Sequence, residues 1–265
     1  MAELEFLHGM IGEHITTHCP GPAYATIYPS REWIVTEKLS EDPVSLTQDD
    51  IDDRLGPAFT VGKYLCRLAG AGNQNMSAFM RIYKQIPVAG TEFAKLSVRR
   101  SQASQRRHIE LDALKVFTEN RCTATPKLFG YQLDTQDADD LVPGGYILYL
   151  VWEKVPGYSL DSQYFWGLPY NQRGVIRDNF KKAYMEVLRL GYHPSMATPS
   201  KIILDKTTND VKICGFRRAS LIDQADREWE DENFAMFSLV LVSSMHAKHI
   251  PIEAGDIQLR NGWEW

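Results

Sequence analysis

Several signatures that would identify a protein class directly are missing from this 265-residue chain. Its four cysteines (Cys19, Cys66, Cys122 and Cys214) lie far apart and form no CxxC pair, which argues against a zinc ribbon and a disulfide framework. No apolar run approaches the roughly 20 residues of a membrane-spanning helix. The N-terminal residues lack the basic and apolar regions of a signal peptide. We therefore expect reduced thiols, a cytoplasmic location and no membrane partner.

An excess of charge of one sign is also missing. The formal net charge is −5, with 29 Lys and Arg against 34 Asp and Glu, so no overall basic footprint suggests a nucleic-acid partner. The composition, with 44% hydrophobic and 24% charged residues, is that of an ordinary globular protein. A chain of this length can form one large domain or two lobes around a cleft.

A phosphate-binding glycine loop is the third absence. Neither GxGxxG nor GxxxxGK[ST] occurs, and the spacing of Gly56 and Gly62 matches neither pattern. This argues against an ordinary nucleotide-using enzyme.

The first quarter of the chain predicts two short helices. Residues 3–17 place apolar side chains roughly on one face of a helix, and Thr47 is a suitable N-cap for a helix in the acidic residues 48–53. A weak metal-binding pattern occurs near the first helix, at His14, His18 and Cys19. No second cluster completes a tetrahedral ligand set, so we expect no metal there.

Alternating apolar residues then predict antiparallel strands at 58–61, 63–68 and 78–86. A helix is predicted at 108–117, a strongly apolar strand at 145–152 and an amphipathic helix at 171–190. An apolar helix is also expected at 234–245.

The stretch from Leu188 to Asp223 has a characteristic order of predicted secondary-structure elements. A helix ends in Leu-Gly-Tyr-His, and a loop, a strand at 202–204, a turn and a strand at 211–214 follow. Gly215-Phe-Arg-Arg-Ala219 comes directly after.

The order of these elements resembles the protein-kinase-like superfamily, particularly its small-molecule and fungal kinase-like branches, over roughly Leu55 to Phe237. The resemblance implies an α+β, two-lobed fold with an N-lobe of antiparallel sheet plus helix and a small, mainly helical C-lobe. It divides the chain into an N-terminal extension (1–54), an N-lobe with the hinge (55–157) and a C-lobe (158–265).

The same resemblance implies a ligand site. Lys84 and Glu110 match the family's strand lysine and helix glutamate. The alternative is a pair that only stabilises the fold. Residues 152–157 look like the hinge that binds adenine. Trp152 is either a side chain that fills the pocket behind adenine or a simple core residue.

Three positions depart from the family's catalytic pattern. Ser195 stands where an aspartate would orient the acceptor hydroxyl, and Gly215 stands where an aspartate would hold Mg²⁺. The metal-binding asparagine falls on Ser200 or Lys201, depending on a one-residue shift. Phosphate transfer is therefore not expected.

We predict a pseudokinase that binds a ligand or protein partner in the cleft between the lobes. It would need no metal or cofactor, and any nucleotide binding would be weak or independent of Mg²⁺. The predicted cleft residues are Lys84, Glu110, Trp152, Glu153, Val155, Tyr164, Trp166, His193, Ser195 and Lys201.

Two alternatives stay open. One is a non-phosphotransfer enzyme whose aromatic-lined, metal-free cleft acts on a hydrophobic small molecule, for example by cyclisation or rearrangement in a biosynthetic pathway. The other is a structural interaction module without a ligand.

Overall fold

The computed structural model describes residues 5–70, 76–242 and 257–265, and these form two compact units. Unit 1 comprises Met1–Arg107 and Leu128–Lys154, and unit 2 comprises His108–Lys127 and Val155–Trp265. None of the helices in the described ranges has the length and apolarity needed to cross a bilayer. The sequence-based division at 54/55 and 157/158 stays a prediction.

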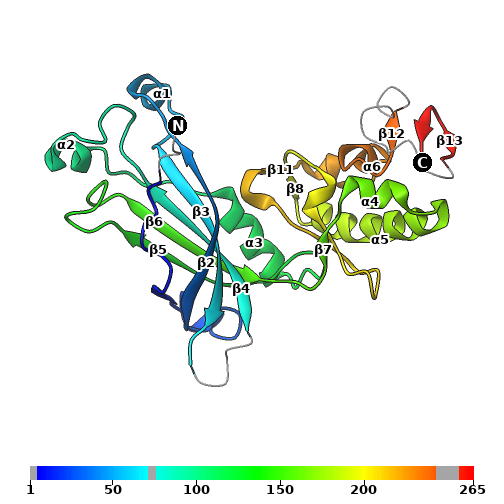
Figure 1. Ribbon diagram of the computed structural model, residues 1–265, viewed down its shortest axis with the longest axis horizontal. Coiled ribbons are helices and arrows are strands. Elements are labelled where there is room, and N and C mark those ends of the chain that lie inside the picture. The colour runs from blue at the N-terminus through cyan, green and yellow to red at the C-terminus, as the bar shows by residue number, and fades with distance from the viewer. Residues whose placement is uncertain (1–4, 71–75, 243–256) are drawn as a thin grey trace. The chain divides into compact units, whose positions relative to one another are not determined.

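Unit 1 is built on one antiparallel sheet of six strands in the order β1-β2-β3-β4-β6-β5 (Figure 1). The predicted mixture of helices with an antiparallel sheet is therefore confirmed. The strands are β1 (His14–Thr17), β2 (Arg31–Val44), β3 (Phe59–Leu68), β4 (Ser77–Gln85), β5 (Leu128–Thr135) and β6 (Tyr146–Glu153). The short helices of the unit are η1 (Pro22–Tyr24), α1 (Gln48–Asp52) and α2 (Leu96–Ser101).

Strand β3 is one continuous strand where the sequence suggested two. Gly62 lies in its middle because its neighbours leave no room for a side chain. A Cβ atom at Gly62 would stand 2.6 Å from the ring of Tyr64 and 2.7 Å from the Leu7 side chain. Alternate residues of β3 and β4, including Tyr64, Cys66 and Met80, are fully buried in the core of unit 1. The period-two pattern of the sequence thus gives one apolar face of the sheet.

The predicted helix at 3–17 is wrong, because Gly9 and Gly12 adopt positive φ angles of 68° and 92°, which no right-handed helix allows. Residues 14–17 instead pair with β2 as strand β1. The His14 imidazole lies 3.1 Å from the Glu32 carboxylate across that pair. No group of three or more metal-ligating side chains occurs among the described residues.

Helix α1 begins where the sequence placed it. Thr47 is its N-cap and forms a capping box with Asp50. The Thr47 backbone N–H donates to the Asp50 carboxylate (2.8 Å), and the Asp50 N–H donates to the Thr47 hydroxyl (3.3 Å). The two bonds satisfy backbone donors that the first turn of a helix leaves open.

Glu41 is a buried polar centre of unit 1. Its side chain is only 4% exposed and accepts hydrogen bonds from Lys38 Nζ (2.6 Å), Phe6 N (2.8 Å) and Thr60 Oγ1 (2.7 Å). Burial alone would raise the pKa of Glu41, but these bonds outweigh it and hold the pKa below its usual value of 4.5. The N-terminal segment is thereby tied to strands β2 and β3.

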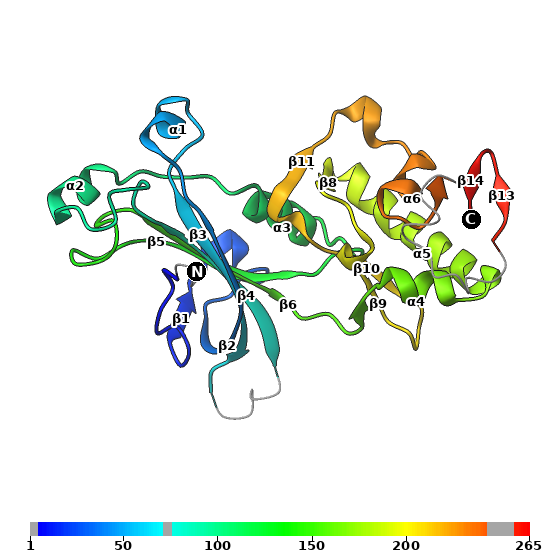
Figure 2. The same ribbon diagram turned by 45° about the horizontal axis from the view of Figure 1, so that its top comes forward.

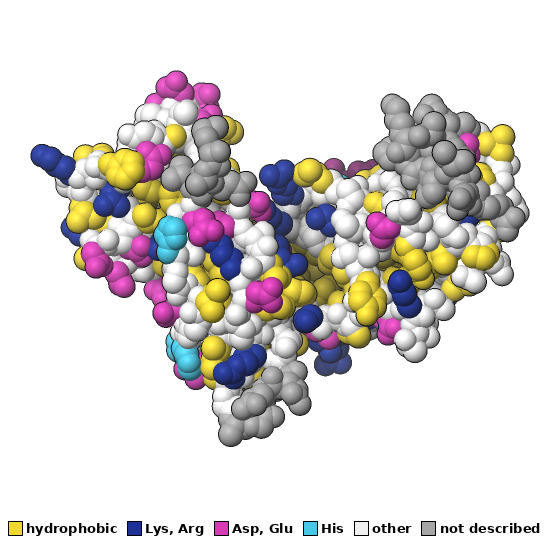
Figure 3. Space-filling view, viewed as in Figure 1, with side chains coloured by type: hydrophobic (Ala, Val, Ile, Leu, Met, Phe, Trp, Pro, Cys, Tyr) yellow, Lys and Arg dark blue, Asp and Glu magenta, His cyan; other side chains and the backbone are white. Residues whose placement is uncertain are grey.

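The segment around α2 is tied to the sheet at its base and exposed at its tip. Gln85 donates to the Gln102 backbone carbonyl (2.7 Å), and the Gln102 side chain accepts from Val88 N (3.1 Å). At the tip the Phe93 side chain is fully exposed. Hydrophobic and basic side chains adjoin at this end of unit 1 (Figure 3).

Unit 2 is mainly helical, with small sheets. Its longest element, α5 (Tyr170–Arg189), was predicted at 171–190, and it lies beside α4 (Ser162–Gly167) in both views (Figures 1 and 2). The other helices are α3 (Ile109–Glu119), η2 (Pro199–Lys201), η3 (Phe216–Arg218), η4 (Gln224–Arg227) and α6 (Glu232–Met236). The strands are β7 (Tyr158–Ser159), β8 (Tyr192–Pro194), β9 (Ile202–Leu204), β10 (Val211–Ile213), β11 (Ala219–Leu221), β12 (Leu241–Val242), β13 (Leu259–Arg260) and β14 (Trp263–Glu264).

Aromatic side chains form much of the core of unit 2. The centre of the Phe237 ring lies 4.7 Å from that of Phe180 and 5.2 Å from that of Tyr184, both on α5. The helix expected at 234–245 is shorter than predicted. It ends at Met236, and Ser238 has a positive φ of 54°. Residues 243–245 lie outside the described part of the chain.

Two buried arginines on α5 were not anticipated. Arg177 donates from Nε to the Leu239 carbonyl (2.8 Å), and Arg173 donates to the Leu168 carbonyl (2.6 Å). Burial, followed by the charge of Arg173, lowers the pKa of Arg177 to about 10. The Arg173 guanidinium lies 5.1 Å from the ring centre of Trp166. These side chains therefore serve as core contacts of unit 2.

Candidate functional site

The residues that sequence analysis singled out at 193–215 lie on short, tightly connected elements of unit 2. Helix α5 leads into β8, which pairs with β11 so that His193 faces Ser220. Helix η2 leads into β9, which pairs with β10 so that Ile202 faces Ile213. The Cys214 N–H donates to the Lys201 carbonyl (2.8 Å). This last bond places the chain at Lys201 directly beside Gly215.

Gly215 adopts a left-handed conformation with φ 88° and ψ 35°, which a glycine reaches without the steric cost of a side chain. The Lys201 side chain covers it. A Cβ atom at position 215 would stand 2.4 Å from Lys201 Cδ and 3.2 Å from Lys201 Nζ. Within the described residues, Lys201 Nζ has no hydrogen bond or ion pair. The space where a residue-215 side chain would begin is therefore taken by the lysine stem, with the ammonium close by.

Ser195 and Ser220 form a hydroxyl pair, with their Oγ atoms 2.7 Å apart. The Ser195 N–H also donates to the Arg218 carbonyl (3.0 Å). His193, two residues earlier, is half-buried. Its Nδ1 atom is buried and has no hydrogen-bond partner among the described residues. Among the described residues, the hydrogen bond of the Ser195 hydroxyl goes to another hydroxyl and not to a base of the kind that activates a serine nucleophile.

The carboxylates nearest in sequence, Asp205 and Asp210, have partners in or beside the turn between β9 and β10. Asp205 accepts from Thr207 N (2.8 Å), and backbone bonds of this kind lower its pKa. Asp210 lies 3.2 Å from the Lys212 ammonium. Gly215 offers no side-chain ligand for a divalent ion, and the nearby Lys201 ammonium would repel one.

Aromatic side chains pack beside Gly215 and strand β8. Phe216 is buried, and its ring lies 4.6 Å from that of Phe117 on α3. The Phe117 ring in turn lies 5.7 Å from that of Tyr192 on β8. Such edge and tilted contacts stabilise a core beyond the area they bury. They hold Gly215 and β8 in place within unit 2.

Lys84, the predicted strand lysine, lies on β4 in unit 1. Its ammonium contacts the Asp140 carboxylate at 2.5 Å, and the lysine side chain is 15% exposed. The Asp140 carboxylate also accepts from Leu141 N (2.9 Å). Glu110 is buried on α3, which belongs to unit 2. The pairing of Lys84 with Glu110 therefore stays a prediction, and Asp140 is a partner that sequence reasoning missed.

The predicted hinge residues lie at the end of β6 and just after it. Trp152 is 8% exposed, and its ring lies 5.9 Å from that of Phe79 and 5.1 Å from the Arg81 guanidinium carbon. It packs within unit 1. Glu153 and Val155 are half-buried. Their role in adenine binding stays a prediction.

The predicted aromatic residues of α4 differ in exposure. Trp166 is fully buried, and its indole N–H donates to the Ser238 carbonyl (3.1 Å). Tyr164 is half-buried, with the Lys206 ammonium 3.7 Å from its ring centre. Tyr164 also lines a pocket of about 310 Å³ with Leu168, Gln172 and Val175. Of these two aromatic residues, only Tyr164 is accessible to a ligand.

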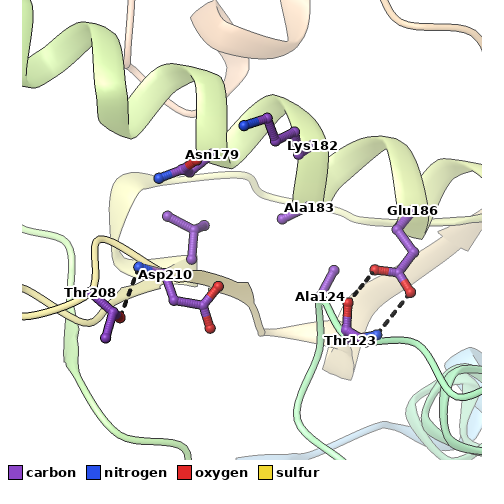
Figure 4. A pocket seen from close by; sticks show the side chains of 9 residues that line it. Thr123, Ala124, Asn179, Lys182, Ala183, Glu186, Thr208 and Asp210 are labelled. Atoms are coloured by element: carbon purple, nitrogen blue, oxygen red, sulfur yellow. Dashed lines mark hydrogen bonds between the residues drawn. The ribbon is translucent and has the colours of Figure 1, made fainter.

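A second pocket of about 310 Å³ in unit 2 is polar and was missed (Figure 4). One wall is a face of α5 with Asn179, Lys182 and Glu186, and Thr123 and Asp210 lie opposite. The Glu186 carboxylate accepts from Thr123 N (2.8 Å) and Thr123 Oγ1 (2.9 Å), which ties the two walls together. The sequence signal for this pocket was the spacing of residues 179, 182 and 186, which places three polar side chains on one face of a helix.

No protein-family model matches the chain, and no curated protein sequence matches it. Among solved structures, the chain is similar to the kinase PK-1 of Cydia pomonella granulovirus, with 11% identity and a TM-score of 0.42. That alignment covers 71% of this chain and 52% of the viral kinase. The chain is also similar to WaaP, solved in complex with acyl carrier protein, with 14% identity and a TM-score of 0.40 over 66% of each chain. The chain thus spans about half of the viral kinase and less than two thirds of WaaP.

Proposed function

We propose that the chain is a kinase-like protein that does not transfer phosphate and that binds a ligand or a protein partner instead. The observation that carries the proposal is the Lys201 side chain lying over Gly215. It occupies the place where the kinase pattern requires a metal-binding aspartate. The order of the elements from α5 through β8, β9 and β10 to Gly215 and Phe216 supports the kinase-like part of the proposal.

The chemical reason is electrostatic. Phosphoryl transfer depends on metal ions that neutralise the charge developing on the transferred group, and on a carboxylate that orients the acceptor hydroxyl. Removing a single electrostatic donor of this kind costs about a hundredfold to a thousandfold in rate. Here a glycine and a lysine replace two metal ligands, and a serine replaces the carboxylate. Several such losses together leave no ordinary route for the reaction.

The test is a phosphate-transfer assay on the purified full chain with radiolabelled ATP and a panel of protein and small-molecule acceptors. We expect no transfer with Mg²⁺ or Mn²⁺, and no metal-dependent rise in melting temperature with ATP. Transfer that co-elutes with the protein on gel filtration and requires the metal would overturn the proposal. The triple variant Ser195→Asp, Lys201→Asn, Gly215→Asp restores the pattern. A gain of metal-dependent stabilisation by ATP in this variant would support the assignment of the three positions.

A further inference from the structure

The chain segments on either side of Lys201 and Gly215 carry positive charge and no negative charge. Residues 192–204 and 211–222, which carry β8, η2, β9, β10, η3 and β11, contain no aspartate or glutamate. They contain four cationic side chains, those of Lys201, Lys212, Arg217 and Arg218. The nearest carboxylates along the chain already have partners, since Asp205 accepts from Thr207 N in the β9–β10 turn and Asp210 lies 3.2 Å from the Lys212 ammonium on β10. A region of this kind attracts anions.

Lys201 is the cation of this group best placed to contact a ligand. Lys212 donates to the Thr123 carbonyl (2.5 Å) and contacts Asp210. Arg218 lies 3.2 Å from the Met196 sulfur, and Arg217 also has an interaction partner within the protein. Lys201 is half-buried and makes no polar contact from Nζ to any described residue. A partly desolvated ammonium without a partner is unfavourable on its own and gains most from an added negative charge.

The backbone beside Lys201 leaves room for such a charge. Gly215 and Lys201 are both partly exposed to solvent. Gly215 has no side chain to cover the ammonium, and its left-handed φ of 88° disfavours one. The Lys201 ammonium therefore lies close to Gly215, at the position where the kinase pattern has a metal ligand.

We propose that the Lys201 ammonium replaces a divalent metal ion and binds an oxyanion of the ligand, a phosphate or a carboxylate group, without metal. This inference rests on the proposed function, because it gives the same degenerate position a role in binding. The lysine supplies one positive charge and hydrogen-bond donors, so it can hold an anionic group. It cannot bridge two phosphates and polarise them as Mg²⁺ does.

The test is calorimetric titration of the full chain in EDTA with ATP, tripolyphosphate, inorganic phosphate, citrate and adenosine. We expect the polyanions to bind without metal and to bind less tightly as NaCl is raised. Lys201→Met keeps most of the stem over Gly215 and removes the charge. It should weaken polyanion binding roughly tenfold or more, the effect of losing one hydrogen bond to a charged group. Lys201→Arg should retain binding.

The matched control is Lys95→Ala. Lys95 is exposed in unit 1, so this variant makes the same change in net charge and should bind like the wild type. The probes also separate the sources of the oxyanion. Tight binding of ATP with weak binding of tripolyphosphate indicates a nucleotide ligand, whereas tight binding of citrate indicates a carboxylate ligand.

Three results would overturn the inference. They are a requirement for Mg²⁺, equal affinity in wild type and Lys201→Met with both folded by circular dichroism, and no binding of any polyanion at millimolar concentration. The first of these would also contradict the expected lack of metal-dependent stabilisation by ATP. The other two leave the proposed absence of phosphate transfer untouched, and a transfer assay decides that absence separately.

Discussion

Lys84 and Lys201 are two lysines in partly buried positions, and they differ in how their charges are compensated. The Lys84 ammonium in unit 1 contacts the Asp140 carboxylate, which is itself held by a backbone N–H. The Lys201 ammonium in unit 2 lies over Gly215 and has no polar partner among the described residues. The first lysine completes a contact inside the protein, whereas the second has no such contact with the described residues, and we propose that it binds a ligand.

This difference separates two roles that the sequence could not tell apart. A charge that a nearby group neutralises contributes to the stability of the fold, because removing one member of the pair leaves the other charge buried without compensation. A half-buried charge without a partner contributes little to stability, and its removal matters for binding. Stability measurements on matched variants should therefore rank the charged contacts of unit 1 above Lys201.

The largest effect is expected for Glu41→Ala in unit 1. The change leaves Phe6 N and Thr60 Oγ1 without their acceptor and removes one of the two carboxylates beside the Lys38 ammonium. Breaking a buried, charged network of this kind costs about 3 kcal/mol. Urea unfolding measures the loss. The control Glu37→Ala removes an exposed carboxylate from the same strand and should change stability by less than about 0.5 kcal/mol.

The pH dependence of the same contact has a definite sign. The pKa of folded Glu41 lies below its usual value of 4.5, so the unfolded chain binds the proton more readily. The stabilisation is fully present above pH 4.5 and is lost as the pH falls through the lower, folded-state pKa. Wild type should therefore lose more stability than Glu41→Ala as the pH falls below 4.5. Parallel curves for the two proteins would contradict this.

The next effect is expected for Asp140→Ala. It leaves the Lys84 ammonium, which is 15% exposed, without its carboxylate, at a cost of about 2 kcal/mol. Chemical denaturation of this variant is compared with that of Asp139→Ala, which removes an exposed neighbouring carboxylate. Equal stability of the two variants would show that the Lys84 contact contributes nothing and would remove one side of the comparison.

A somewhat smaller effect is expected for Gly215→Ala. The added methyl group must adopt a left-handed φ and displace the Lys201 stem, which we expect to cost about 1–2 kcal/mol. Gly167→Ala is the control, because nothing lies within 4 Å of its added Cβ atom. Combining Gly215→Ala with Lys201→Ala should recover part of the loss. Strict additivity in this double-mutant cycle would argue against the contact between the two residues.

The smallest effect on stability is expected for Lys201→Met. The ammonium has no partner to strand, so thermal and urea unfolding should shift by no more than about 0.5 kcal/mol in either direction. A loss of 2 kcal/mol, like that expected for Asp140→Ala, would mean that the Lys201 charge is neutralised within the protein.

Much of the fold followed from hydrophobic periodicity. Strands β4 and β6 and helix α5 were placed within one or two residues of their bounds, because each buries one regular face. Strand β1 was missed, since its apolar residues also suit a helix, and only the positive φ angles of Gly9 and Gly12 exclude one. Gly62 was taken for a break because its tight neighbours, Tyr64 and Leu7, are not visible in the local sequence.

The sequence named the residues of the candidate site, whose roles stay predictions, and it did not give their contacts. The sequence left Ser200 and Lys201 as alternatives for one position. In the structure, Ser200 pairs with the Thr198 hydroxyl (2.8 Å), while Lys201 lies over Gly215. Asp140 is 56 positions from Lys84, and Ser220 is 25 positions from Ser195. Pairings over such distances depend on strand register and loop path, which local patterns do not encode.

The cysteines give the two units separate chemical reporters. Cys66 is buried in the core of unit 1, and Cys122 is buried in that of unit 2. Burial raises the pKa of Cys66 to about 12 and also raises that of Cys122. Because the thiolate is the form that reacts with alkylating reagents, each thiol should be labelled only when its own unit opens. Labelling rates at these two positions would therefore reveal whether the units unfold as one cooperative body or independently.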